Sequence, residues 1–176
     1  MEIKVNKKEL IHQGKVFNLF AENITLPNGH TTTLSIIRHP GASAMVAVTE
    51  PRKIILIRQY RHAVNGFIWE IPAGTLDPGE SPLDCARREL VEEAGVSADV
   101  WQKLGEIIPV PGYSDERIHI FLAENLTIAE QNLDSDEVLE VHSFDFAEVL
   151  EMIRSGQIMD AKSISGIFMA KSHLNF

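Results

Sequence analysis

The sequence contains a single cysteine, Cys85, so no disulfide can form within the chain. It also lacks long apolar runs: the longest, 44–48 and 54–57, are the size of β-strands, and we expect no membrane span. The first ten residues, MEIKVNKKEL, alternate charged and apolar side chains and lack the apolar stretch of a signal peptide. These absences together predict a cytoplasmic protein.

Positive charge is also scarce. The chain has 16 Lys and Arg residues against 25 Asp and Glu residues, which gives a formal net charge of −9, and no basic cluster exceeds two residues. This composition disfavours nonspecific binding to nucleic acid, which depends on basic surface. An acidic protein can nevertheless bind an anionic substrate when metal ions supply the positive charge.

With 176 residues, of which 44% are hydrophobic and 23% charged, the chain has the size and composition of one globular domain with a real core. Strand patterns dominate its first half, and an Asn-Gly pair at 28–29 predicts a β-hairpin. Few helices, segregated in sequence, favour an α+β fold with helices on a mixed sheet. The predicted strands are 15–26, 30–38, 43–49, 53–60, 67–71, 101–109, 117–124 and 138–144, and the predicted helices begin at Pro82, Phe146 and Ala161.

The helix that begins at Pro82 has clear signals at both ends. Ser81 stands at the N-cap, Pro82 at the first helical position, and Gly95 just past the last turn. Apolar residues recur along it at steps of three and four, which predicts one buried stripe. The stripe consists of Leu83, Ala86, Leu90 and Ala94.

Glu89, Glu92 and Glu93 cluster beside this stripe, because residues three and four apart are neighbours on a helix. Like charges at these spacings destabilise a bare helix by roughly 0.2–0.5 kcal/mol per pair. A solvated acidic face is the simplest alternative interpretation of such a cluster. A hard divalent cation with oxygen ligands would compensate the repulsion and give the three glutamates a chemical role.

The segment 74–96, GTLDPGESPLDCARRELVEEAGV, resembles the complete Nudix box, with every fixed position of that pattern filled. The resemblance implies an α/β/α sandwich with a mixed sheet, in which the box forms a loop, a helix and a loop. It also implies an N-terminal antiparallel β extension over 1–40 and a Nudix hydrolase domain over 41–176. Relatives with such an extension are homodimers, often with that segment exchanged between subunits, so we expect a homodimer.

Two segments before the box narrow the resemblance. RQYR at 58–61 and WEIPAG at 69–74 resemble the pattern of ADP-ribose and related nucleoside-diphosphate-sugar pyrophosphatases, and Pro111 lies where that subfamily has a marker proline. The resemblance implies hydrolysis of ADP-ribose to AMP and ribose 5-phosphate. The implied cofactor is Mg²⁺, for which Mn²⁺ can substitute, and the implied partner is a small nucleotide-sugar substrate rather than nucleic acid or a membrane.

The resemblance implies roles for several residues. Glu93 and Glu80 are expected to be catalytic, Glu80 by supporting the metal shell or joining it, and Arg88 is expected to orient the glutamates through charge-assisted hydrogen bonds. Glu137 is the expected base that activates water, with Glu116 as its rival. The implied metal ligands are the carbonyl of Ala73 and the side chains of Glu89, Glu92 and Glu93, and the implied substrate-binding residues are Arg58, Arg61, Glu70 and Glu116.

Other readings of the same residues stay open. Arg58 and Arg61 could be surface arginines of a strand, and Trp69 could belong to the core rather than stack on a base. The substrate could be GDP-mannose, another sugar nucleotide or a dinucleoside polyphosphate. Oxidised nucleoside triphosphates fit less well, because shorter chains without WEIPAG hydrolyse them. A sensor that binds ADP-ribose without turnover belongs to a different class, and the intact glutamates argue against it.

Overall fold

The computed structural model of the chain describes residues 3–50 and 52–174. Its helices are α1 (Pro82–Ala94), α2 (Phe146–Arg154) and α3 (Ala161–Leu174), with a short 3₁₀ helix at His62–Val64. Its strands are β1 (Lys4–Gln13), β2 (Asn18–Thr25), β3 (Thr31–Arg38), β4 (Ala42–Thr49), β5 (Lys53–Arg61), β6 (Gly66–Glu70), β7 (Ala73–Thr75), β8 (Val96–Ile107), β9 (Ile118–Ile128) and β10 (Leu139–Asp145). In this part of the chain, no helix has the length and apolar character needed to cross a membrane.

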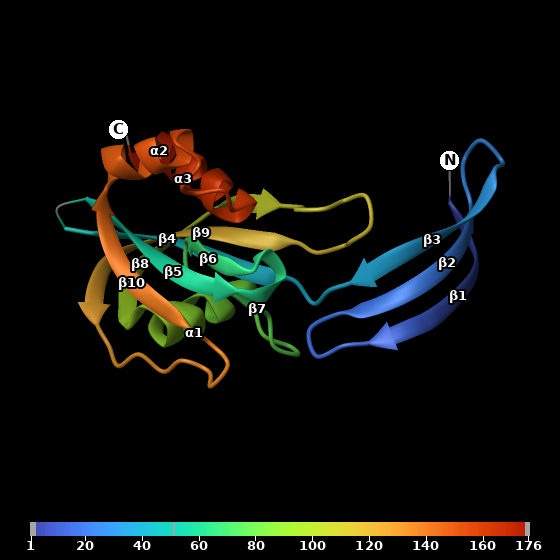
Figure 1. Ribbon diagram of the computed structural model, residues 1–176, viewed down its shortest axis with the longest axis horizontal. Helices are drawn as coiled ribbons and strands as arrows, with labels where there is room; N and C mark the ends of the chain where they lie inside the picture. Colours follow the sequence, from blue (N-terminus) through green and yellow to red (C-terminus); the bar gives the residue numbers. More distant parts are fainter. Residues whose placement is uncertain (1–2, 51, 175–176) are drawn as a thin grey trace.

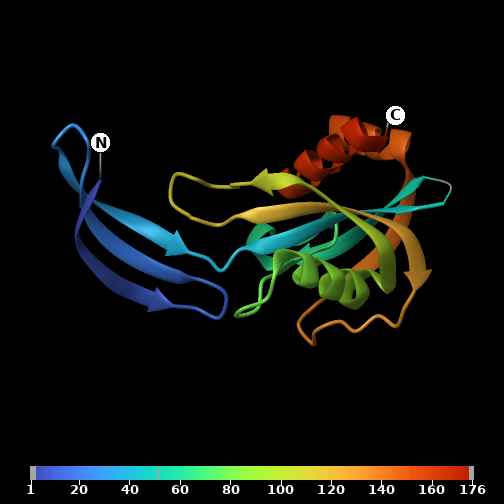
Figure 2. The same cartoon turned by 180° about the vertical axis from the view of Figure 1, so that it is seen from behind.

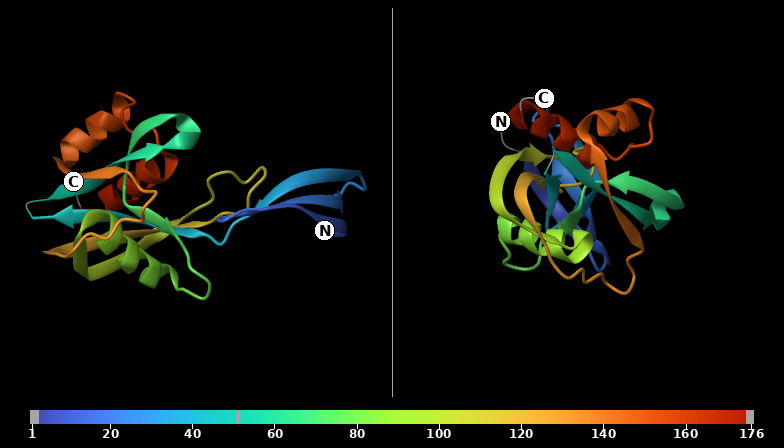
Figure 3. Two further views of the ribbon diagram at one scale, coloured as in Figure 1. Left: turned by 60° about the horizontal axis from the view of Figure 1, so that its bottom comes forward. Right: turned by 90° about the vertical axis from the view of Figure 1, so that its left-hand side faces the viewer.

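The body of the protein is built on one seven-stranded mixed sheet. Five strands follow one another in the order β10-β5-β4-β9-β8, while β6 pairs with β5 and β7 pairs with β4. β4 and β9 are parallel, and the other pairs of this sheet are antiparallel. Helices cover both faces: α1 lies on one side, and α2 and α3 lie on the other (Figures 1 and 3). The predicted α+β fold with helices on a mixed sheet is confirmed.

Strand β4 is buried on both faces and therefore contributes to two cores. Val46 and Val48 point to the side of α2 and α3, where they pack in a cluster with Val149 and Ile167. The alternate residues of β4 belong to the opposite cluster, which contains the apolar stripe of α1. This alternation follows from the two-residue period of a strand, and a central strand flanked by helices is apolar throughout for that reason.

Helix α1 has the ends that the sequence predicts. The Asp84 N–H donates to Ser81 Oγ over 3.2 Å, and Gly95 ends the helix in the left-handed conformation with φ of 64°. Leu90 is completely buried in the core beneath the helix. The rotation of α1 about its axis is therefore set by the burial of its apolar stripe, and this rotation also sets where its glutamates point.

Residues 4–38 form a separate three-stranded antiparallel sheet, β1-β2-β3, that projects away from the body (Figures 1 and 2). The predicted hairpin is present, with Gly29 at φ of 82° between β2 and β3. Arg38, at the end of β3, joins this sheet to the body: its guanidinium binds the buried Glu22 and, over 3.0 Å, Asp115. The extension is thus anchored to the loop between β8 and β9.

Two strands are longer than predicted. β8 begins at Val96, directly after α1, and β9 continues to Ile128, whereas the predicted strands covered 101–109 and 117–124. The added residues, 96–100 (VSADV) and 125–128 (NLTI), alternate apolar and polar side chains, so the sequence does carry a strand signal there and the predicted strands were too short. The two strands pair with each other along almost their whole length.

Candidate active site

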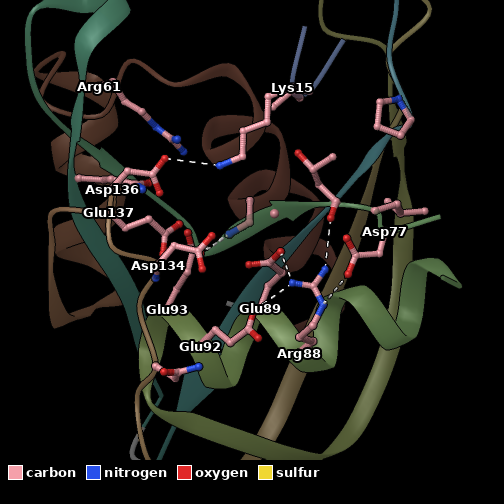
Figure 4. A pocket seen from close by; sticks show the side chains of 18 of the residues that line it. Lys15, Arg61, Asp77, Arg88, Glu89, Glu92, Glu93, Asp134, Asp136 and Glu137 are labelled. Carbon is pink, nitrogen blue, oxygen red and sulfur yellow. Dashed lines mark hydrogen bonds and ion pairs between the residues drawn. The ribbon is translucent and has the colours of Figure 1, made fainter.

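One cavity of about 810 Å³ lies where the acidic face of α1 meets β5, β7 and the loop before β10 (Figure 4). Its charged residues come from elements far apart in the sequence. Carboxylates from α1 and from the loop before β10 face cations from β5 and from the turn between β1 and β2. The charged lining residues include Lys15, Arg61, Asp77, Arg88, Glu89, Glu92, Glu93, Asp134, Asp136 and Glu137.

Glu93 is the most deeply placed of these carboxylates, with 1% of its surface exposed. Its Oε2 accepts a hydrogen bond of 2.7 Å from the backbone N–H of Ala73, so α1 is tied to β7 at this point. Burial raises the pKa of Glu93 to about 8, and burial also raises the pKa of Glu89. A cation placed at these carboxylates would offset the cost of keeping them ionised.

Gly74 leaves room for Glu89. A Cβ atom on residue 74 would lie 1.8 Å from Glu89 Oε1, a distance at which the two atoms overlap. With Glu89 in this position, a side chain at residue 74 would push the Glu89 carboxylate aside. This is a physical reason for the glycine that opens the box.

Arg88 links three carboxylates. Its Nη1 donates to Glu89 Oε1 over 2.6 Å and to Glu92 Oε2 over 2.9 Å, while Nε and Nη2 each donate to Glu80 over 2.9 Å. Its hydrogen bonds hold the pKa of Glu80 down at about 2. Arg88 makes the charge-assisted hydrogen bonds expected of it and offsets part of the like-charge repulsion along α1.

As the side chains stand, no three Asp, Glu, His or Cys residues in the described part of the chain are placed to hold a metal ion. Glu89 and Glu92 both accept hydrogen bonds from Arg88. The donor chemistry nevertheless fits a hard divalent cation: the donors are carboxylate oxygens, and burial raises the pKa of both Glu89 and Glu93, so each ionises at a cost that a cation would offset.

The loop before β10 brings Glu137 to the same cavity. Gln131 Nε2 donates to the carbonyl of Glu93 over 2.5 Å, and the N–H of Asn132 donates to the carbonyl of Glu92 over 3.2 Å, so the loop is fastened to the end of α1. Glu137 Oε2 accepts a hydrogen bond of 3.0 Å from the N–H of Asp134. The Glu137 carboxylate is thereby held near Glu89 and Glu93, on which its charge acts.

Arg61, at the end of β5, faces the acidic wall (Figure 4). Its Nε donates to Glu70 Oε2 over 2.8 Å, and its charge reaches Glu93, where it opposes the effect of burial on the pKa. Lys15 approaches from the turn between β1 and β2, with its Nζ 3.5 Å from Asp136 Oδ2. The cavity therefore has cations opposite carboxylates.

Other residues singled out in the sequence lie elsewhere. Arg58 lies 3.6 Å from Glu140 and over the ring of Phe67, and Glu116 lies beside His39, 3.8 Å from its Nδ1. Neither of the two belongs to the described lining of the cavity. Glu70 is buried behind Arg61, and Glu80 is held by Arg88. Their placement leaves Glu137 in the cavity and Glu116 outside it.

Some residues that line the cavity were not predicted from the sequence as site residues. Lys15 sits in a turn, and Asp134 and Asp136 sit in a loop, where polar residues are common. Their proximity to α1 depends on how the extension and the loop pack. Trp69 packs edge-to-face with His142 and Phe144 and against the buried core, in agreement with the alternative interpretation that it is a core residue.

A cavity with buried carboxylates on one wall and an arginine on the other is the arrangement of an enzyme that binds a diphosphate together with divalent cations. The profile described as NUDIX domain matches residues 38–163. The chain belongs to the Nudix family, and the prediction of a Nudix pyrophosphohydrolase is confirmed.

Individual relatives agree with this assignment. The chain is 41% identical to ADP-ribose pyrophosphatase of Bacillus subtilis (strain 168), over 95% of this chain and 91% of that protein. It is 38% identical to the methanol dehydrogenase activator of Bacillus methanolicus, over 94% of this chain and 91% of that protein. A crystal structure of an ADP compounds hydrolase superposes with a TM-score of 0.87 at 23% identity, covering 99% of this chain and 95% of the other, which confirms the fold.

The Glu80–Arg88 pair predicts a pH-dependent loss of stability. Because the pKa of Glu80 falls from 4.5 to about 2 on folding, the pair stabilises the protein fully above pH 4.5 and loses its contribution as the pH falls toward 2. We expect Glu80→Gln to lower the free energy of unfolding by about 1.5–3 kcal/mol at pH 7. Urea unfolding in EDTA at pH 7 and pH 3.5 should show a smaller difference from wild type at the lower pH.

The matched control is Glu130→Gln, which makes the same substitution at an exposed position. It should leave the free energy of unfolding nearly unchanged at both pH values. A difference between Glu80→Gln and wild type that stays constant from pH 7 to pH 3.5 would contradict the account of the pair.

Proposed function

We propose that the protein hydrolyses the diphosphate bond of ADP-ribose, giving AMP and ribose 5-phosphate, with Mg²⁺ as its cation and Mn²⁺ as a substitute. The observation that carries the proposal is the cavity in which Arg61 faces the carboxylates of α1. The similarity to the Bacillus subtilis pyrophosphatase over nearly the full chain supports the choice of substrate. Other nucleoside-diphosphate sugars are substrates of the same chemical class.

The carboxylates of Glu89, Glu92 and Glu93 would hold the cation, together with the backbone carbonyl of Ala73. When bound, such a cation neutralises diphosphate charge and lowers the pKa of a water molecule. Arg88 already bonds two of these carboxylates and Glu80, so it keeps the ligand side chains on one face of the helix. Glu80 acts in this proposal through Arg88, as a support of the ligand set.

Glu137 is the proposed base. Its Oε2 accepts the N–H of Asp134, which fixes the side chain and leaves Oε1 to accept the proton of an attacking water. The loop that carries it is fastened to α1 through Gln131, so the base and the metal ligands keep one geometry. Arg61 would bind the diphosphate on the opposite side. Arg58 and Glu116, also expected at the substrate, stay predictions.

The first experiment measures phosphate release, with a coupled phosphatase, from ADP-ribose, ADP-glucose, GDP-mannose, UDP-glucose, NADH and diadenosine polyphosphates in Mg²⁺. We expect ADP-ribose to be preferred, EDTA to abolish turnover, and millimolar Mg²⁺ to restore it, because carboxylates alone cannot neutralise a diphosphate. Preference for GDP-mannose, or broad turnover, would reassign the substrate within the class. Hydrolysis that persists in EDTA would contradict the mechanism, and silence across the panel would favour a binding protein.

Glu137→Gln tests the base. We expect kcat to fall by about 10²–10⁴-fold with little change in KM, the size of a lost general base. Steady-state kinetics with ADP-ribose should be compared with those of Glu116→Gln, which changes the rival glutamate in the same way. If Glu116→Gln lowers kcat and Glu137→Gln does not, the base is Glu116.

We further propose that the protein is a homodimer that uses the extension, and that it works in the cytoplasm, where a single buried thiol stays reduced. All residues of β1 are exposed, and Val5, Leu10 and Ile11 are about half exposed, which leaves apolar surface for a second subunit. Light scattering of the full chain should give twice the mass of 19.7 kDa. A chain lacking residues 1–38 should be monomeric and impaired; full activity as a monomer would contradict the proposal.

A further inference from the structure

Glu70, the partner of Arg61, is held by a second cation from the far end of the chain. The Glu70 side chain is 4% exposed, and each of its oxygens accepts from a different residue. Oε2 accepts from Arg61 Nε over 2.8 Å, and Oε1 accepts from Lys162 Nζ over 2.5 Å. Lys162 lies in the first turn of α3, and its side chain is 11% exposed.

The position of Lys162 is itself fixed. Its Nζ also lies 3.0 Å from Asp160 Oδ2, and the same oxygen accepts the N–H of Ser163 over 2.9 Å as the cap of α3. Ser163 Oγ in turn accepts the N–H of Ile71 over 2.8 Å. The first turn of α3 is therefore joined to two consecutive residues, Glu70 and Ile71, at the end of β6.

The packing of α3 brings this turn close to β6. Gly166 lies one turn further along the helix, and a Cβ atom there would be 2.9 Å from Ile71 Cδ1. Gly166 is buried, and Ile167 beside it is completely buried in the core. Lys162 therefore reaches Glu70 from a rigid support rather than from a mobile surface.

Arg61 and Lys162 bond different oxygens of the Glu70 carboxylate. An arginine beside an otherwise unengaged carboxylate tends to form two parallel N–H···O bonds with both oxygens. Here Lys162 donates to Oε1, and Arg61 donates to Oε2 from Nε. Its terminal Nη1 and Nη2 are then available to the cavity that Arg61 lines.

We propose that Lys162 is a positioning residue for substrate binding: by occupying Glu70 Oε1 it keeps the Nη groups of Arg61 turned toward the diphosphate. This inference rests on the proposed function only in the choice of ligand. Without Lys162, the Glu70 carboxylate can turn and take a second hydrogen bond from Arg61, which draws the guanidinium out of the cavity.

The test compares Lys162→Met with Lys162→Arg, which keeps a donor for Oε1, and with Lys171→Met, the same substitution at the other end of α3. We expect Lys162→Met to raise KM about tenfold, the size of one charge-assisted hydrogen bond, with kcat within about twofold of wild type. Lys162→Arg should restore most of the affinity, and Lys171→Met should match wild type. Equal KM values for wild type and Lys162→Met would overturn the proposal.

A double-mutant cycle separates positioning from a general structural effect. In an Arg61→Ala background, Lys162→Met should raise KM no further, because the residue it positions is gone. An equal increase in both backgrounds, or a drop in kcat that follows a drop in Tm, would overturn the proposal. Lys162→Gln, which removes the charge but keeps a polar end, is measured in the same way if Lys162→Met does not fold.

The Lys162 variants are compared with whichever compound of the substrate panel the wild-type protein hydrolyses best. The test of Lys162 therefore still applies if the protein does not hydrolyse ADP-ribose. Calorimetric binding of ADP gives a second readout that needs no turnover. We expect the Kd of ADP to rise about tenfold in Lys162→Met and to stay unchanged in Lys171→Met. An unchanged Kd in Lys162→Met would contradict the role of Lys162 even if the proposed reaction holds.

Discussion

The close approach of α1 to β7 is the constraint on which the site depends. Glu89 lies against Gly74, where a Cβ atom would be 1.8 Å from its Oε1, and Glu93 accepts the N–H of Ala73 one residue earlier. The apolar stripe of α1 is buried on the sheet on the same side, so the helix cannot rotate to move its carboxylates into water. The energy of core packing therefore holds negative charge in a place where burial makes ionisation costly.

The cost of ionising these buried carboxylates favours the binding of a cation beside them. A buried carboxylate such as Glu93, whose pKa burial raises to about 8, lowers the stability of the fold, so stability alone does not explain its presence. Arg88 compensates Glu89, Glu92 and Glu80, and it leaves Glu93 to other partners. A diphosphate site benefits from this imbalance, because a cation is bound most strongly where ionised oxygens lack a counter-charge.

Local features of the fold could be predicted, and contacts between distant segments could not. The caps at Ser81 and Gly95 and the turn at Gly29 are set by neighbouring residues, and they appear as expected. The partner of Glu70 is different: Lys162 is 92 residues away, and a lysine near a helix start is usually solvated. Its burial depends on how α3 packs on Ile71, which no spacing within α3 reveals.

The short segment 70–74 connects the two halves of the site. On one side of the sheet, α3 bonds Glu70 and Ile71; on the other, α1 bonds Ala73 and places the Glu89 carboxylate against Gly74. Arg61 bonds Glu70 of the first pair, and the carboxylates proposed to bind the metal lie against the second pair. One stretch of backbone held from both layers therefore separates the cationic and anionic walls, so we expect a change in the packing of α3 to move Arg61 relative to the carboxylates of α1.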